Sequence, residues 1–115
     1  MIGAAHRFHG YGSLRGVYQH GRSARGPMMS LKFNRRNNTK PYRVAVVVSR
    51  KVNKSAVARN RIRRRIYEAV RQSAVDITPG TDLIFTVFDD RLAELSADKL
   101  QAITNDLLQK AAGGN

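Results

Sequence analysis

Alternating and continuous runs of apolar residues predict three β-strands in this chain. In PMMSLKFN, the side chains of Met29, Leu31 and Phe33 fall on one face of an extended segment, which is the period-two pattern of a half-buried strand. YRVAVVVS, residues 42–49, is a nearly continuous run of β-branched residues and predicts a well-buried strand. LIFTVF, residues 83–88, follows the turn-like sequence DITPGTD and predicts another buried strand.

Three other segments carry the signals of helices. SLRGVYQHG, residues 13–21, has a serine placed to cap a short helix, apolar residues at helical spacing and a glycine placed to end it. Ser55 is expected to cap a second helix that continues to about Ser73, and Ser96 a third that ends before Gly113. The order helix, strand, strand, helix, strand, helix predicts an α+β fold in which one sheet and its packed helices form two layers.

The connections and the length of the chain complete the expected fold. An additional short strand is expected near the turn-rich basic loop at residues 35–41, so the sheet should contain about four strands beside three helices. A turn is expected at the adjacent pair Asp89–Asp90. With 115 residues the chain is long enough for one modest core and is expected to form a single domain, with flexible ends at residues 1–12 and 112–115.

The composition excludes several classes of protein. The chain has no cysteine, which excludes disulfides, thiolate zinc sites and thiol nucleophiles. No apolar run approaches the roughly 20 residues of a membrane-spanning helix, and the N-terminal residues lack the apolar stretch of a secretion signal. A cytoplasmic location without membrane contact is therefore expected.

The 21 lysine and arginine residues are concentrated in one part of the chain. Residues 1–67 hold 17 of them and no aspartate or glutamate, whereas residues 68–115 hold four basic residues and all eight acidic ones. A charge that served only solubility would be mixed in sign along the chain, so this segregation indicates a polyanionic partner, most commonly nucleic acid. An anionic membrane surface is the other possibility, but it favours a basic helix with a broad apolar face, and the apolar face here is narrow.

The second predicted helix concentrates this charge, because five of the seven residues from Arg59 to Arg65 are arginine. At about 100° per residue, one stripe of the helix is apolar and should face the core: Ala58, Ile62, Ile66, Ala69 and Val70. The residues on the opposite side are Asn60, Arg64, Tyr67 and Arg71. Like charges three or four residues apart cost about 0.2–0.5 kcal/mol per pair, and Glu68, the only acid on the helix, can relieve only Arg64 or Arg65.

The choice of arginine indicates what this helix binds. A face that is merely solvated would combine lysine with glutamate, because that mixture is soluble and stabilising. The planar guanidinium group is instead suited to bidentate recognition of phosphate, so the helix is predicted to bind a phosphate backbone. RNA is favoured over DNA, because helices that read the DNA major groove usually belong to compact helical motifs or dimers. A rigid basic helix on a small sheet suits the shape of structured RNA.

The residues available for catalysis argue against an independent nuclease. A two-metal nuclease needs clustered carboxylates, yet no acidic residue precedes Glu68. His6, His9 and His20 can in principle supply a general acid and a general base. Two of them lie in the glycine-rich N-terminal segment, and the third lies at a helix end, where it favours the helix dipole.

The segment ARNRIRRRIYEA resembles the RNR signature of the bacterial ribonuclease P protein family, carried here by Arg59, Asn60 and Arg61. The surrounding segments are also similar to the family's pattern and occur in the same order: YQHGRSARG, RVAVVVSRKV, TPGTDLIFTV and ELS. The resemblance covers about residues 7–111 without a break. An isolated RNR would be a weak signal, whereas this ordered set is a strong one.

The resemblance implies a fold and an activity. It implies an α/β sandwich with a left-handed β-α-β crossover, against the usual right-handed rule. It also implies a protein subunit of ribonuclease P, an endoribonuclease whose RNA subunit is the catalyst and removes the 5′ leader from precursor tRNA. The protein is then expected to hold no catalytic residue and no metal ion, with Mg²⁺ belonging to the active site of the RNA. It is expected to act as a monomer, with the catalytic RNA and precursor tRNA as its partners.

The resemblance also implies two sets of binding residues. In the family the RNR helix and the loop before it face the RNA subunit, and the corresponding residues here are Arg50, Lys51, Lys54, Arg59, Asn60, Arg61, Arg63 and Arg64. A cleft between the first helix and the sheet receives the single-stranded leader, and Leu14, Tyr18 and Lys32 occupy the matching positions. Base stacking on Tyr18 is worth about 1–3 kcal/mol, while core packing is an equally good interpretation of that residue.

Several positions depart from the family's pattern. Leu14 stands where an aromatic residue is frequent and Lys32 at a strand position that can carry tyrosine, so leader contacts there should involve less stacking and more phosphate. Arg65 occupies a position that is often apolar and Tyr67 one that is often basic, which predicts that this edge of the helix meets its partner differently. The competing interpretation is a small basic ribosomal or ribosome-assembly protein without an enzymatic role.

Overall fold

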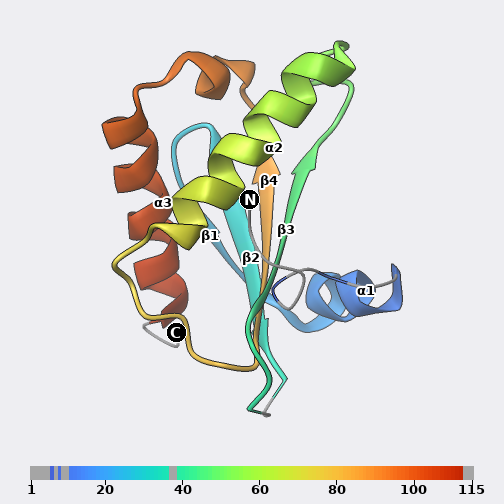
Figure 1. Cartoon of the computed structure of the whole chain (residues 1–115). Helices are drawn as coiled ribbons and strands as arrows, with labels where there is room; N and C mark the ends of the chain where they lie inside the picture. The colour runs from blue at the N-terminus through green and yellow to red at the C-terminus, as the bar shows by residue number, and fades with distance from the viewer. Residues whose placement is uncertain (1–5, 7, 9–10, 37–38, 113–115) are drawn as a thin grey trace.

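A computed structural model describes residues 6, 8, 11–36 and 39–112 of the chain (Figure 1). Its helices are α1 (Tyr11–His20), α2 (Ala56–Arg71) and α3 (Ala97–Ala112), with a short 3₁₀ helix, η2 (Asp90–Glu94). Its strands are β1 (Arg22–Arg25), β2 (Met29–Arg35), β3 (Arg43–Val48) and β4 (Thr81–Val87). The three predicted helices and the three predicted strands are all present, with ends shifted by one or two residues. None of the helices in the described part of the chain is long and apolar enough to cross a lipid bilayer.

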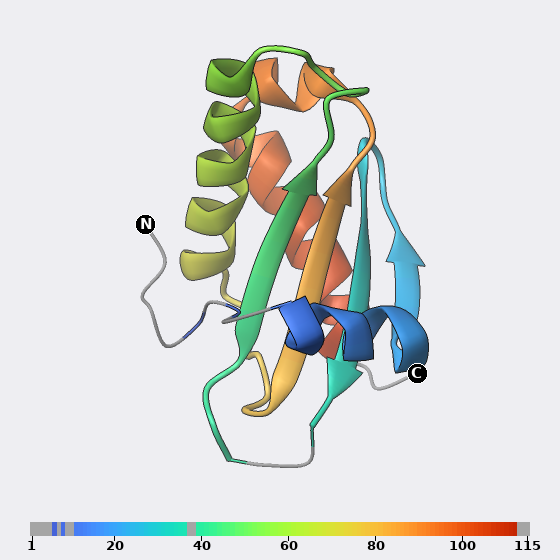
Figure 2. The same ribbon diagram turned by 90° about the vertical axis from the view of Figure 1, so that its right-hand side faces the viewer.

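One mixed four-stranded sheet in the order β1-β2-β4-β3 organises the fold. β4 pairs antiparallel with β2, where Phe85 lies opposite Leu31, and parallel with β3, where Phe85 lies opposite Val46. Figure 2 shows α1 crossing one face of the sheet, whereas α2 and α3 cover the other. In that view β3 and β4 both point upward, β4 lies to the right of β3, and α2 joins them on the far face. The crossover is therefore left-handed, as the resemblance implied.

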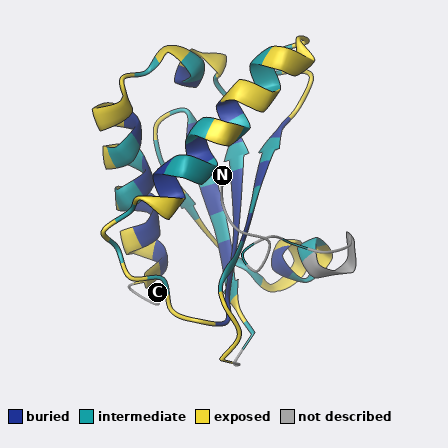
Figure 3. Ribbon diagram, in the orientation of Figure 1, coloured by how far each residue is buried: buried dark blue, intermediate teal, exposed yellow. Residues whose placement is uncertain are grey.

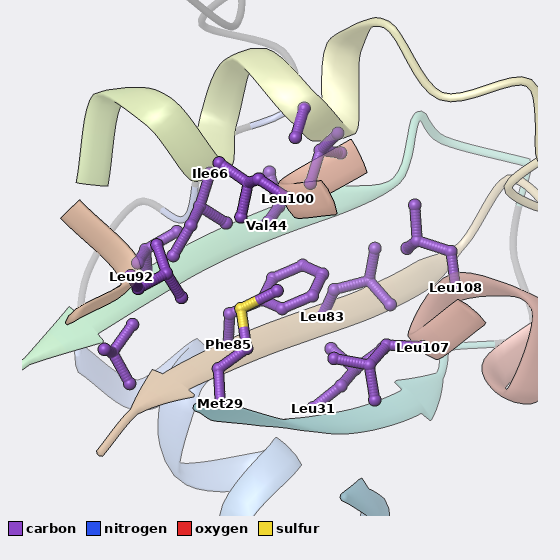
Figure 4. Packing of buried hydrophobic residues seen from close by; sticks show 14 of the residues in the cluster. Met29, Leu31, Val44, Ile66, Leu83, Phe85, Leu92, Leu100, Leu107 and Leu108 are labelled. Carbon is purple, nitrogen blue, oxygen red and sulfur yellow. The ribbon is translucent and has the colours of Figure 1, made fainter. Parts of the chain in front are cut away.

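The main hydrophobic core lies between the sheet and the two helices α2 and α3 (Figure 4). Alternate residues of β2, β3 and β4 face this core, and Leu31, Val44 and Phe85 are almost completely buried. The helices contribute fully buried side chains such as Ile66 and Leu107, and Figure 3 shows that their outer sides are exposed. Each such side chain contributes about 1.5–3 kcal/mol when it leaves water, so this layer supplies most of the apolar stabilisation.

The central strand β4 is buried on both faces, which confirms the predicted buried strand. Leu83 and Phe85 face the main core, while Ile84 points to the opposite face, where α1 packs. Ile84 and Val17 of α1 are both fully buried. Figure 2 shows that α1 crosses this second face without following its whole length.

Two strand predictions are wrong. The fourth strand is β1, which pairs with β2, rather than a strand near residues 35–41. Its sequence, RSAR, has no apolar alternation, and only its pairing with β2 makes it a strand. β3 is not buried throughout but is an edge strand, with Val44 and Val46 in the core and Ala45 half-buried. A run of valines is compatible with either position, because β-branched residues are favoured in edge and central strands alike.

A buried carboxylate ties together one end of the sheet. Asp82 of β4, whose side chain is 3% exposed, accepts hydrogen bonds from Arg36 Nε at 2.8 Å and from Arg43 Nε and Nη2 at 2.9 and 2.8 Å. Two guanidinium groups thus compensate one buried negative charge, which would otherwise be costly. The Arg43 guanidinium also lies 4.8 Å from the ring centroid of Phe8. Phe8, which precedes α1 in the chain, therefore packs beside β3.

Candidate nucleic-acid interface

The helix α2 is fixed in orientation by its N-cap and its apolar stripe. The Ser55 Oγ accepts a hydrogen bond from the Ala58 N–H at 3.2 Å, as predicted for an N-cap. Four residues of the predicted stripe are buried: Ile62, Ile66, Ala69 and Val70. Because these side chains must face the core, the position of every arginine around the helix follows from its place in the sequence.

The outward side of α2 carries the groups that can reach a polyanion. Arg61 and Arg64 are exposed, and within the described residues neither forms an ion pair. Arg63 is half-buried, and its Nη1 donates to Asn60 Oδ1 at 3.0 Å, which orients the two side chains together. Val57 is 77% exposed and adds apolar surface one turn before Arg61. This side offers guanidinium donors suited to phosphate oxygens.

Arg65, in contrast, points into the protein. Its Nη1 donates to the carbonyl oxygens of Leu92 and Ala93 at 2.7 and 2.8 Å, and its Nη2 donates to that of Leu95. These carbonyls lie at the C-terminal end of η2, where backbone oxygens lack helical partners and attract a cation. The Arg65 side chain is therefore engaged within the protein, and the predicted difference in partner contact at this edge of α2 stays a prediction.

A second basic loop, residues 49–55 (hereafter the basic loop), connects β3 to α2, and Arg59 holds its shape. The Arg59 Nη1 donates to the backbone carbonyls of Asn53 and Lys54, both at 2.9 Å. The carbonyl of Ser49 accepts from the N–H of Asn53 at 3.4 Å and closes the other side of the loop. The basic side chains of this loop are exposed: Arg50, Lys51 and Lys54. Arg59 thus holds the loop that presents three of the predicted RNA-binding residues.

A groove of about 750 Å³ lies between α1 and α2. Val44 and Ala45 of the edge strand β3 line it together with Leu14 of α1. From α2 the lining residues are Val57, Asn60, Arg63, Arg64 and Tyr67. This α1–α2 groove places Leu14, which the resemblance assigns to the leader, on the same surface as three residues assigned to the RNA subunit. Phe8 also lines the groove, and no signal in the sequence indicated its role.

Tyr18 and Lys32 lie together outside the α1–α2 groove. Tyr18 is 47% exposed, so it does not belong to the core. The Lys32 Nζ lies 5.8 Å from the centroid of the Tyr18 ring, within the range of a cation–π contact. An aromatic surface for a base and a cation for a phosphate are therefore adjacent. Leu14 does not join this pair, although it is one turn from Tyr18 on α1.

The prediction that Tyr67 lies on the solvent side of α2 is wrong. Tyr67 is half-buried and packs against the main core. Its hydroxyl oxygen accepts a hydrogen bond from the Val46 N–H at 3.3 Å. Because β3 is an edge strand, this contact covers a backbone donor that has no partner strand.

Glu68 pairs with Arg71 rather than with Arg64 or Arg65. Its carboxylate accepts from Arg71 Nε at 2.9 Å and from Gln72 Nε2 at 2.7 Å. The hydrogen bond from Arg71, with smaller help from Gln72, lowers the pKa of Glu68 to about 2. The only acid of the helix is thus occupied at its C-terminal end, and the charge of the preceding turns is left for an external partner.

His6 and His20, the two histidines within the described residues, have different surroundings. The Nδ1 of His6 lies 2.9 Å from the Tyr42 carbonyl oxygen, and the two rings stack with centroids 3.9 Å apart. His20 ends α1 and is exposed, and His9 lies outside the described residues. In the part of the chain that the structure describes, no three histidine, aspartate or glutamate side chains lie close enough to hold a metal ion.

Known protein sequences resemble nearly the whole chain. The family model described as ribonuclease P matches residues 3–112. The ribonuclease P protein component of Synechococcus sp. is 34% identical over 114 residues, which cover 96% of this chain and 85% of that protein. The ribonuclease P protein component of Roseiflexus castenholzii is 41% identical over 75 residues, which cover 65% of this chain and 61% of that protein.

The fold also has counterparts among solved structures. The RNase P protein of Staphylococcus aureus gives a TM-score of 0.75 at 22% identity, covering 93% of this chain and 95% of that chain. The RNase P protein of Thermotoga maritima gives a TM-score of 0.73 at 20% identity, covering 84% and 89%. The four-stranded sheet with three helices is therefore shared with these structures.

The arginines of α2 should differ in their effect on stability. Arg65→Ala removes a charged donor from three carbonyls, so we expect the free energy of unfolding to fall by about 1.5–3 kcal/mol. Arg64→Ala, which removes an exposed side chain from the next position, should change it by less than about 0.5 kcal/mol. Urea denaturation followed by circular dichroism measures both. Equal losses in the two variants would contradict the assignment of Arg65 to an internal contact.

Proposed function

This chain belongs to the bacterial ribonuclease P protein component family, and we propose that it holds two RNA molecules together. Proteins of this family are components of ribonuclease P, an endoribonuclease involved in tRNA 5′ maturation. In the proposed arrangement α2 and the loop before it bind the catalytic RNA. The groove beside α1 and the adjoining face of the sheet bind the 5′ leader of precursor tRNA.

The α1–α2 groove is the observation that carries this proposal. One wall is Leu14, which offers apolar surface, and the other carries Asn60, Arg63 and Arg64, which offer hydrogen-bond donors. A single strand needs both kinds of surface, because its bases pack against apolar or aromatic groups and its backbone attracts cations. Tyr18 provides a second, exposed aromatic surface on α1.

The exposed cations around the start of α2 support binding of the catalytic RNA. Arg61 and Arg64 project from the helix, and the basic loop adds further charges from the same end. Arginine forms bidentate hydrogen bonds with phosphate, and each phosphate that is neutralised releases counterions into solution. A rigid helix that presents these groups suits recognition of RNA by its shape and backbone.

The same charge explains why an RNA enzyme benefits from a protein. The catalytic RNA and the precursor are both polyanions, and their mutual repulsion opposes binding. A protein of net charge +13 between them reduces that repulsion. Contact with the leader also distinguishes the precursor from mature tRNA, which has lost it.

The proposal assigns hydrolysis and its Mg²⁺ ions to the RNA subunit and no metal ion to the protein. Three of the eight acidic side chains are engaged in ion pairs with arginine, namely Asp82, Glu68 and Asp89. Mg²⁺ is commonly held by phosphate oxygens and water with few protein ligands. In this role the protein acts in the cytoplasm, as a single copy within the ribonucleoprotein.

Removal of two outward cations should weaken binding to the catalytic RNA. For Arg61→Ala combined with Arg64→Ala, we expect lower affinity and a slope of log K against log salt that is shallower by about one to two units. Filter binding over a range of salt concentrations measures both quantities. The matched control, Lys99→Ala with Lys110→Ala, removes two charges from α3 and should leave the slope unchanged. Identical slopes for the first double variant and the wild type would contradict phosphate contacts at these positions.

Loss of the Tyr18 ring should affect the precursor only. Tyr18→Ala should weaken holoenzyme binding to precursor tRNA by about 1–3 kcal/mol, because a stacked base loses its partner. Binding of mature tRNA should not change, and Tyr18→Phe, which keeps the ring, should behave like the wild type. Equal losses for precursor and mature tRNA would show that Tyr18 does not contact the leader.

The direct test of the function is reconstitution with a ribonuclease P RNA. At Mg²⁺ concentrations too low for the RNA alone, adding the protein should restore cleavage of precursor tRNA, because its cations reduce the repulsion between the two RNAs. The protein without RNA should cleave nothing. Cleavage by the protein alone would refute the assignment of catalysis to RNA. A protein that binds RNA without promoting cleavage would instead fit a ribosomal or ribosome-assembly role.

A further inference from the structure

Asp90 places a negative charge beside the surface that the proposed function assigns to the catalytic RNA. It is exposed at the start of η2, and it shares a cavity of about 380 Å³ with Arg61 and Asn53. A carboxylate at this place repels phosphate, so on electrostatic grounds alone it weakens RNA binding. Its hydrogen bond with Asn53, however, indicates a structural role.

Asn53 connects Asp90 to the basic loop. The Asn53 Nδ2 donates to Asp90 Oδ2 at 3.2 Å, while its Oδ1 accepts from the Ser55 N–H at 2.8 Å. The backbone carbonyl of Asn53 accepts from Arg59 Nη1 at 2.9 Å. Asn53, in the middle of the loop, is therefore hydrogen-bonded to Ser55, to Arg59 and to Asp90 of η2.

On the other side of this contact, η2 is anchored at both of its ends. Arg65 joins the C-terminal carbonyls of η2 to α2, with Nη1 at 2.7 Å from the Leu92 oxygen. At the other end Asp89 caps η2, as expected of a turn residue, by accepting from the Arg91 N–H at 3.0 Å. Asp89 is also paired with the Arg91 side chain. Of the two adjacent acids, Asp90 is the one that reaches the loop.

We propose that Asp90 is a positioning residue that holds Asn53, and with it the basic loop, in the orientation in which Arg50, Lys51 and Lys54 meet the catalytic RNA. This inference rests on the proposed function, because it concerns the geometry of the same RNA-binding surface. A loop that is already ordered loses less conformational entropy when it binds. In this proposal, the conformational entropy saved on binding outweighs the repulsion between the Asp90 carboxylate and the RNA phosphates.

Two substitutions at one position separate the tether from the charge. Asp90→Asn removes the charge but keeps an oxygen that accepts from Asn53, whereas Asp90→Ala removes both. We expect the asparagine variant to bind the catalytic RNA at least as tightly as the wild type. The alanine variant should bind about three- to tenfold more weakly, with a salt slope shallower by about one unit as loop contacts are lost. Equilibrium binding across salt concentrations measures both.

Further variants exclude a general effect of charge or stability. Asp76→Ala removes an exposed acid between α2 and β4 and should not weaken binding. In the Asn53→Ala background the tether is already absent, so Asp90→Ala should no longer weaken binding. Thermal unfolding of both Asp90 variants should give midpoints close to the wild type, because this hydrogen bond is exposed.

The outcomes distinguish this inference from the proposed function. Unchanged or tighter binding by the alanine variant, or equal weakening by both variants, would overturn the tether, because the hydrogen bond from Asn53 would then not account for the result. Failure of the wild-type protein to bind the catalytic RNA, or unchanged binding in the Arg61 and Arg64 double variant, would instead refute the proposed function, and the inference would fail with it. Weakening by alanine with rescue by asparagine supports the positioning role.

Discussion

Burial of one apolar stripe allows α2 to carry an excess of positive charge. Ile62 and Ile66 are fully buried, and each contributes about 1.5–3 kcal/mol. A pair of like charges on an exposed helix costs only about 0.2–0.5 kcal/mol, so a few such pairs do not offset the stripe. The buried side also fixes the rotation of the helix on β3. The helix consequently stays folded despite the repulsion between its arginines, and the exposed arginines keep fixed positions on its surface.

Four of the five arginines between positions 59 and 65 fall into two groups, one exposed and one engaged within the protein. Arg61 and Arg64 project outward, whereas Arg59 and Arg65 donate to backbone carbonyls of the segments on either side of the helix. The inward pair orders the loop and η2, which flank the outward pair. Affinity for a polyanion depends on this division, because unrestrained cations lose side-chain entropy when they bind. In the proposed function, a cluster of one residue type therefore serves both as the binding surface and as its support.

Segregation of charge along the chain does not carry over directly into space. Asp82 belongs to the acidic C-terminal part, yet it lies buried between Arg36 and Arg43 from the basic part. Glu68 neutralises its neighbour Arg71. The acids thus compensate some cations internally and leave others free at the start of α2. Within the described residues, the pattern of cations without an ion pair, rather than the net charge, defines the surface that we propose for RNA.

The sequence alone was sufficient to predict α1, α2, α3 and three of the four described strands, since their period, caps and turns are local properties of the chain, whereas only a turn was predicted where η2 begins. It also identified α2 as the helix predicted to bind a polyanion, because the apolar stripe dictates which arginines remain outside. The strand β1, the edge position of β3 and the inward contacts of Tyr67 and Arg65 were decided only by the tertiary structure. β1 pairs with its neighbour β2, but its polar sequence RSAR carries no strand signal of its own. The edge position of β3 and the contacts of Tyr67 and Arg65 depend on partners distant in sequence, such as β4 or η2, whose positions no local pattern specifies. The α1–α2 groove has the same origin, because its two walls meet only when the left-handed crossover brings α2 beside the open edge of β3.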